Sequence, residues 1–193
     1  MDVHRINVKF YLEGGQEIDR ETWFRIFNTW ISTATDEVLV DVADYSHVGA
    51  GPVVLLVGHE ANYSIDNTDH RLGLLYSRKQ PLKGNLYERL RAAFLASLKA
   101  CRRLEEEPEL KGMVKFRGDE AWLVLNDRLN APNAEETFAA LEPDLKGLLN
   151  DLYAGADFTF QRNPNPKQLF SLNIRAEGTW DIPALLKNIE IGP

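Results

Sequence analysis

Each helical pattern in this sequence is followed by strand patterns that come in pairs, and this order excludes an all-parallel sheet. Helix–strand–strand units span residues 20–58, 86–126 and 134–175. Strands joined by short turns pair antiparallel, whereas parallel strands need a long crossover between them. The units share topology more than residues, so they indicate a common architecture and not a duplicated sequence.

Alternation of apolar and polar residues predicts the individual strands. Residues 52–58 are apolar on both faces, which is typical of a central strand covered on both sides. Residues 59–69, between the third and fourth of these strands, are interpreted as a polar loop, and residues 117–120 as a turn within a hairpin. The predicted strands span residues 5–12, 37–44, 52–58, 71–78, 113–116, 121–126, 158–162 and 169–175.

Apolar residues at helical spacing predict three main helices. Asp19 or Thr22 caps the first, and Asn85 caps the second in a capping-box pattern. Asn133 caps the third, and Pro143 kinks that helix or divides it. A short closing helix is predicted for residues 182–189.

These elements predict one α+β domain over residues 1–193. Its expected architecture is a curved, largely antiparallel sheet of about seven or eight strands with three main helices packed on it. A proline and a glycine interrupt the pattern at residues 80–84, so a subdivision into 1–80 and 85–193 stays open.

Charge and cysteine content narrow the function classes. The net charge of −7 argues against nucleic acid, which needs an excess of Lys and Arg. The single cysteine, Cys101, excludes a disulfide framework and is expected to be a buried core residue. Residues 1–5 carry no apolar signal segment, and no apolar run is long enough to cross a membrane. We therefore predict a cytoplasmic protein.

Familiar catalytic motifs are absent from the sequence, so residues 44–71 hold the main candidates. This segment contains His47, His59 and His70 together with several carboxylates. Histidine combined with carboxylate is typical of metal sites and of acid–base catalysis. His47 and His59 flank the strand at 52–58, about 23 Å apart, and cannot share a site.

Pairing of 52–58 with 71–78 would instead bring His59 and His70 to one end of the sheet. We expect these two histidines to act there as metal ligands or as acid–base groups. Glu60 would be their carboxylate partner, and Arg71 would clamp an anion. The same loop supplies Asn62 and Tyr63 as binding residues. The alternative is a polar loop whose residues only make turns.

Asp44 is a separate candidate binding residue, because it shares strand parity with Val40 and Val42 and could point toward the core. The more common role for such a residue is to cap the end of a strand.

Three function classes stay open. The first is a non-catalytic protein that binds a small ligand or a protein partner through the sheet or the loop at residues 59–71. The second is a metal-dependent hydrolase or related enzyme that uses His59, His70 and Glu60. The third is a structural subunit of a larger assembly, including a homodimer paired through the sheet edges. The sequence identifies no cofactor.

Overall fold

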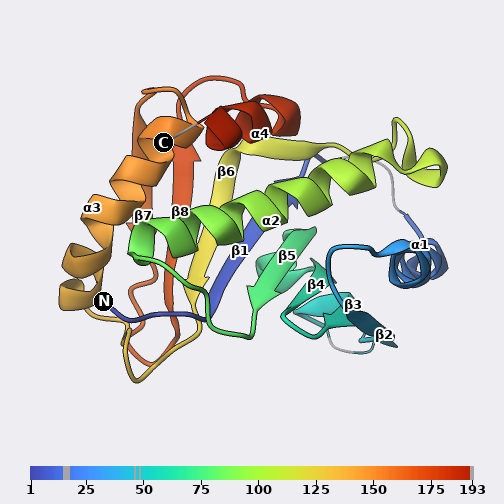
Figure 1. The fold of residues 1–193 in the computed structure, drawn as a ribbon, viewed down its shortest axis with the longest axis horizontal. Coiled ribbons are helices and arrows are strands. Elements are labelled where there is room, and N and C mark those ends of the chain that lie inside the picture. Colours follow the sequence, from blue (N-terminus) through green and yellow to red (C-terminus); the bar gives the residue numbers. More distant parts are fainter. Residues whose placement is uncertain (15–17, 46, 48, 192–193) are drawn as a thin grey trace.

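The computed structural model describes residues 1–193 except 15–17, 46, 48 and 192–193. The described residues form eight strands and four α-helices (Figure 1). The strands are β1 (Ile6–Leu12), β2 (Leu39–Asp44), β3 (Pro52–Gly58), β4 (Ala61–Asp66), β5 (Gly73–Arg78), β6 (Phe116–Leu125), β7 (Phe158–Arg162) and β8 (Phe170–Ala176). The helices are α1 (Arg20–Thr33), α2 (Leu86–Glu106), α3 (Glu135–Leu152) and α4 (Ile182–Ile191).

All eight strands belong to one sheet, in the order β2-β3-β4-β5-β1-β6-β8-β7. Every neighbouring pair is antiparallel. Strand β1 lies near the middle and pairs with both β5 and β6. The predicted α+β class and the antiparallel sheet are confirmed, and α4, the predicted closing helix, joins the three main helices.

The helices cover one face of the sheet (Figure 1). Helix α2 crosses β1 and β5 and contacts α3 and α4, while α1 packs on β2 and β3. Phe94 of α2 meets Phe10 of β1 edge to face, with ring centroids 6.2 Å apart. Trp30 of α1 packs in the same way on Tyr63 of β4. The core therefore lies between this helical layer and the sheet.

The opposite face of the sheet has no helix packed on it within the described part of the chain, and we call it the open face. Because side chains alternate along a strand, Asn7, Lys9 and Tyr11 of β1 point there while Val8 and Phe10 point to the helices. The register aligns Asn7 with Ser77 of β5, which in turn faces Asn62 of β4. Polar side chains thus run across the middle strands of the open face.

Several local predictions about the helices are confirmed. Asp19 caps α1 through Thr22, and Asn85 caps α2 in a complete capping box with Glu88. Cys101 is buried, and burial raises the pKa of its thiol well above the usual range. It is therefore a core residue.

The helix predicted here is present as α3, but its predicted cap and its predicted division at Pro143 are wrong. Pro143 lies within an unbroken helix, and Ala134, not Asn133, occupies the N-cap position. The side chain of Asn133 donates instead to the carbonyl oxygens of Asn163 and Asn165. It therefore organises the turn between β7 and β8.

The polar loop predicted for residues 59–69 is wrong over Ala61–Asp66, which form β4. Tyr63 and Ile65 are buried on the helical side, whereas Asn62 and Ser64 lie on the open face. Because β4 lies between β3 and β5, residues 52–58 and 71–78 do not pair with each other.

The turn predicted for residues 117–120 is also wrong, because they lie inside the continuous strand β6. Gly118 is needed there, since a Cβ atom at this position would come within 2.5 Å of the carbonyl oxygen of Trp180. The amide of Gly118 donates to that oxygen at 3.1 Å. The glycine therefore permits a close backbone approach and not a turn.

In β2 a register shift between Leu39 and Asp41 changes which residues face the core. Leu39 is buried, whereas Val38 and Val40 are exposed. Val42 is buried, so the expectation that Val40 shares a core-facing side of the strand with it is wrong.

Candidate functional site

The predicted partnership of His59 and His70 is wrong. His59 lies in the turn between β3 and β4, and His70 lies in the connection between β4 and β5. The six residues of β4 separate them by about 20 Å at 3.3 Å per residue. Among the described residues, no three His, Cys, Asp or Glu side chains gather closely enough to hold a metal ion.

The other predicted site residues are also dispersed. Glu60 forms an ion pair with Arg78 at 2.8 Å. Tyr63 points to the helical side, where its hydroxyl donates to Glu37 at 3.0 Å, whereas Asn62 lies on the open face. Asp44 is exposed and lies 3.3 Å from Arg20, so its predicted orientation toward the core is wrong.

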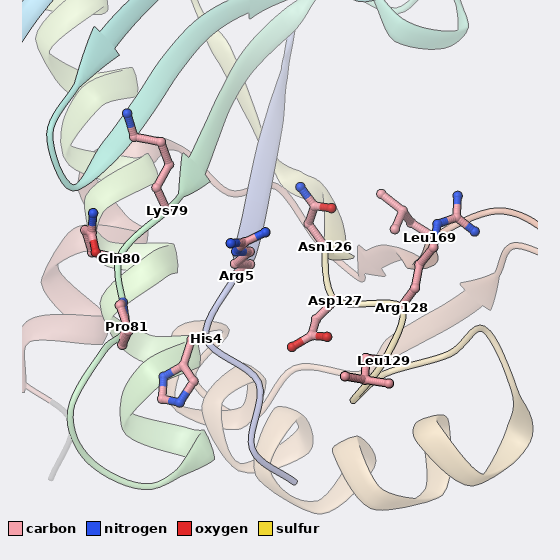
Figure 2. Close-up of a pocket in the computed structure, with 10 residues that line it drawn as sticks. All are labelled: His4, Arg5, Lys79, Gln80, Pro81, Asn126, Asp127, Arg128, Leu129 and Leu169. Carbon is pink, nitrogen blue, oxygen red and sulfur yellow. The ribbon is translucent and has the colours of Figure 1, made fainter.

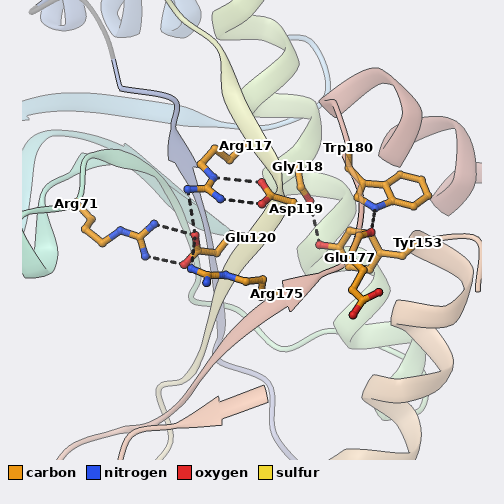
Figure 3. A network of polar contacts seen from close by, with 9 residues as sticks. All are labelled: Arg71, Arg117, Gly118, Asp119, Glu120, Tyr153, Arg175, Glu177 and Trp180. Atoms are coloured by element: carbon orange, nitrogen blue, oxygen red, sulfur yellow. Dashed lines mark hydrogen bonds and ion pairs between the residues drawn. The ribbon is translucent and has the colours of Figure 1, made fainter. Parts of the chain in front are cut away.

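Arg71 does hold an anion, but the anion is a side chain of the same protein. Its guanidinium donates two hydrogen bonds to Glu120, at 2.7 and 2.9 Å (Figure 3). Arg175 and Arg117 lie 3.4 and 3.6 Å from the same carboxylate. We call these four residues the arginine–glutamate cluster. Hydrogen bonding from Arg71 is the main reason that the pKa of Glu120 lies below its usual range.

A buried ion pair lies beside this cluster. Lys9 Nζ is 2.6 Å from Asp66 Oδ1, and both side chains are almost fully buried. Asp66 also accepts from the backbone amide and the hydroxyl of Thr68. Burial lowers the pKa of Lys9, although Asp66 opposes this effect.

Tyr11 links the ion pair to the cluster. The Arg71 guanidinium stacks on its ring at 3.7 Å, and Lys9 lies 5.3 Å from the centre of the same ring. The pKa of Tyr11 is raised to about 12, mainly because the side chain is buried. The carboxylates of this region are therefore already occupied by cations of the chain, and the arrangement serves to hold β1, β4 and β6 together.

A different arrangement occupies the other end of the open face. A hollow of about 640 Å³ opens there (Figure 2). A second hollow of about 440 Å³ adjoins it and shares Arg5, Lys79 and Asn126 with it. We call the two together the cationic groove. The first is lined by His4, Arg5, Lys79, Gln80, Pro81, Asn126, Asp127, Arg128, Leu129 and Leu169, and the second adds Asn7, Asn62, Ser77 and Arg78.

The sheet topology brings the three shared residues together. Arg5 directly precedes β1, whereas Lys79 and Asn126 directly follow β5 and β6. Because β1 is antiparallel to both neighbours, its beginning lies beside their ends. A backbone hydrogen bond from the amide of Asn126 to the carbonyl of Arg5, at 2.8 Å, fixes this arrangement.

The groove is positively charged within a negatively charged protein. Arg5, Lys79 and Arg128 line the first hollow together with a single carboxylate, Asp127. Across the described residues, no carboxylate lies within 4.0 Å of the charged nitrogens of Arg5 or Lys79. The carboxylate of Asp127 accepts hydrogen bonds from Asn130, and these are the main reason that the pKa of Asp127 lies below its usual range.

Amide and hydroxyl side chains extend the groove across the sheet. Asn62, Ser77 and Asn7 follow one another on β4, β5 and β1, each about 5 Å from the next. The Oδ1 atom of Asn7 is buried and receives no hydrogen bond from the described residues. This row places amide and hydroxyl side chains beside the cations of the groove.

Comparison with known proteins adds no family: no family model matches the chain, and a search of curated proteins finds no match. None of the helices in the described ranges has the length and apolar character needed to span a bilayer.

Of the predicted site residues, only Asn62 lines the groove. Arg5 begins one predicted strand, Asn126 ends another and Lys79 directly follows a third, so a correct strand order would have placed the three side by side. The predicted homodimer stays a prediction; the sheet edges on which it depends are β2 and β7.

Proposed function

We propose that this chain is a non-catalytic binding protein and that the cationic groove binds an organic anion. The observation that carries the proposal is the convergence of Arg5 and Lys79 on one hollow. Asp127 lines the same hollow and feels the charge of Arg5, but among the described residues no carboxylate lies within 4.0 Å of the charged nitrogens of either cation. Hydrogen bonds from charged donors to an oxyanion contribute about 1.5–3 kcal/mol each. Two such donors support a dissociation constant near 1 mM, by order of magnitude, for a simple oxyanion.

The side chains of the groove favour binding over catalysis. His4, the histidine in the lining, lies 3.0 Å from Asp2 and has no hydrogen bond to a nucleophile within the described part of the chain. The hydrolase alternative depended on His59 and His70 acting together, and β4 separates them. The proposal therefore assigns the groove a recognition role.

A titration with inorganic phosphate tests the proposal. In a heteronuclear NMR titration, we expect the backbone amides of Arg5, Lys79 and Asn126 to shift with a common dissociation constant. The double variant Arg5→Gln, Lys79→Gln should bind at least tenfold more weakly, because both charged donors are lost.

The matched control removes the same charge elsewhere. Arg102 and Lys146 are exposed, and each forms an ion pair with a glutamate one turn away on its own helix. The double variant Arg102→Gln, Lys146→Gln should bind phosphate like the wild type. Equal weakening in both double variants would show a general charge effect and contradict the proposal. Turnover of p-nitrophenyl phosphate that is lost in the groove variant would contradict the non-catalytic role.

A further inference from the structure

Apolar side chains share the first hollow of the cationic groove with the cations. Leu129 and Leu169 lie on the side of Asn126 and Arg128, while Lys79 and Gln80 lie opposite, with Arg5 between the two sides (Figure 2). Leu129 is 89% exposed, more than the other large hydrophobic residues that reach the surface of the described chain. An exposed leucine alone is ordinary, but this one borders a cationic hollow, where it is accessible to the apolar part of a ligand.

The position of Leu129 is fixed by the residues around it. The side chain of Asp127 accepts hydrogen bonds from the amide and the side chain of Asn130, at 3.1 and 2.8 Å. The amide of Ala131 donates to the carbonyl of Asp127 at 2.8 Å. This closed turn holds Leu129 outward, so covering it requires little further ordering of the chain.

From this arrangement we infer that the ligand of the groove is an amphipathic anion, an oxyanion joined to an apolar substituent. The inference rests on the proposed anion-binding function. The oxyanion is held by Arg5, Lys79 and the side-chain amide of Asn126, and the apolar part covers Leu129 and Leu169. The hollow of about 640 Å³ lies in the range of small-molecule sites, about 300–1,000 Å³, and far exceeds the volume of an inorganic anion.

Phenyl phosphate and inorganic phosphate separate the two parts of the ligand. Calorimetric titrations of the full chain should give phenyl phosphate about a tenfold lower dissociation constant, because the ring buries apolar surface against Leu129 and Leu169. Leu129→Ser should reduce this advantage at least threefold and leave the affinity for inorganic phosphate unchanged. Ile191→Ser, which changes an exposed apolar residue on α4, should leave both affinities unchanged.

The outcomes distinguish the two proposals. Equal affinities for phenyl phosphate and inorganic phosphate would overturn the amphipathic ligand and leave anion binding intact. An advantage of phenyl phosphate that survives Leu129→Ser would overturn the placement of the apolar part. Phenol binding as tightly as phenyl phosphate would overturn the role of the oxyanion. If neither phosphate shifts the groove amides, anion binding and the amphipathic ligand are overturned together.

Discussion

The two ends of the open face use charge in opposite ways. Around Glu120 and Asp66, cations and carboxylates lie within 2.6–3.6 Å of one another, so each carboxylate is neutralised by the chain itself. At the other end, Arg5 and Lys79 line a hollow, and no carboxylate of the described residues lies within 4.0 Å of their charged nitrogens. The paired charges hold strands of the sheet together, whereas the cations without an ion pair are the ones that we propose to recognise a ligand.

The largest effect on stability is expected from Asp66→Asn. It leaves the buried ammonium of Lys9 without its counter-charge, which should lower the free energy of unfolding by about 3–5 kcal/mol. Asp44→Asn is the matched control, because Asp44 is exposed beside Arg20 and should contribute less than about 1 kcal/mol. Urea unfolding of both variants measures the difference. Similar losses of unfolding free energy in the two variants would show that burying the Lys9–Asp66 ion pair adds no stability beyond that of an exposed pair.

Glu120→Gln should lower the free energy of unfolding by about 2 kcal/mol at pH 7, because the hydrogen bonds from Arg71 lose their ionic character. The pKa of Glu120 is lower in the folded chain than in the unfolded chain. Its ionised form therefore stabilises the fold above about pH 4.3, and this stabilisation is lost as the pH falls through the lowered pKa.

The gap between wild type and Glu120→Gln should therefore close in acid. Urea unfolding at pH 7 and pH 3 compares the two proteins directly. A gap that is as wide at pH 3 as at pH 7 would mean that the carboxylate acts through shape and not through charge.

A smaller effect of opposite sign is expected from Asn7→Val. The buried Oδ1 of Asn7 lacks a hydrogen-bond donor among the described residues, and an apolar replacement removes that cost. The free energy of unfolding should rise by about 1 kcal/mol. Asn62→Val is the control, because Asn62 accepts from the amide of Gly58 and should not gain. Thermal unfolding that ranks the two variants equally would refute this account of Asn7.

The smallest change in stability is expected from the double variant Arg5→Gln, Lys79→Gln. Since neither cation pairs with a carboxylate in the described chain, the free energy of unfolding should change by less than about 0.5 kcal/mol. The same variant should lose phosphate binding. A loss of stability as large as that of Glu120→Gln would show that the charges at both ends of the open face stabilise the fold. It would contradict the difference between the two ends.

Local patterns in the sequence predicted most of the helices and strands but not which strands lie side by side in the sheet. The alternation in Tyr63, Ser64 and Ile65 is a strand signal, yet the polar residues of Ala61–Asp66 resemble a loop because they line an uncovered face. Gly118 resembles a turn residue because the approach of Trp180, 62 positions later, has no local signal. Both errors come from tertiary contacts that a local pattern does not contain.

The candidate site was predictable only in part. Asn62 was predicted as a binding residue and lines the groove, whereas Arg71 was predicted to clamp an anionic ligand and instead pairs with Glu120 of the same chain. Arg5, Lys79 and Asn126 come from three segments that only the strand order brings together. Eight strands were predicted and eight are present, but they are not the same eight. Strand β4 was not predicted, and the two strands predicted at 113–116 and 121–126 are one strand, β6.

The central place of β1 also has a consequence for how the chain folds. Strands β2 to β5 lie next to one another on one side of β1, and β6 to β8 lie on its other side, so β1 joins the two halves of the sheet. On the ribosome, β1 is made before either neighbour, and its second edge stays unpaired until β6 has emerged, more than a hundred residues later. Such long-range pairing is typical of folding in milliseconds to seconds. The order of synthesis therefore leaves the strand that joins the two halves exposed for the longest time.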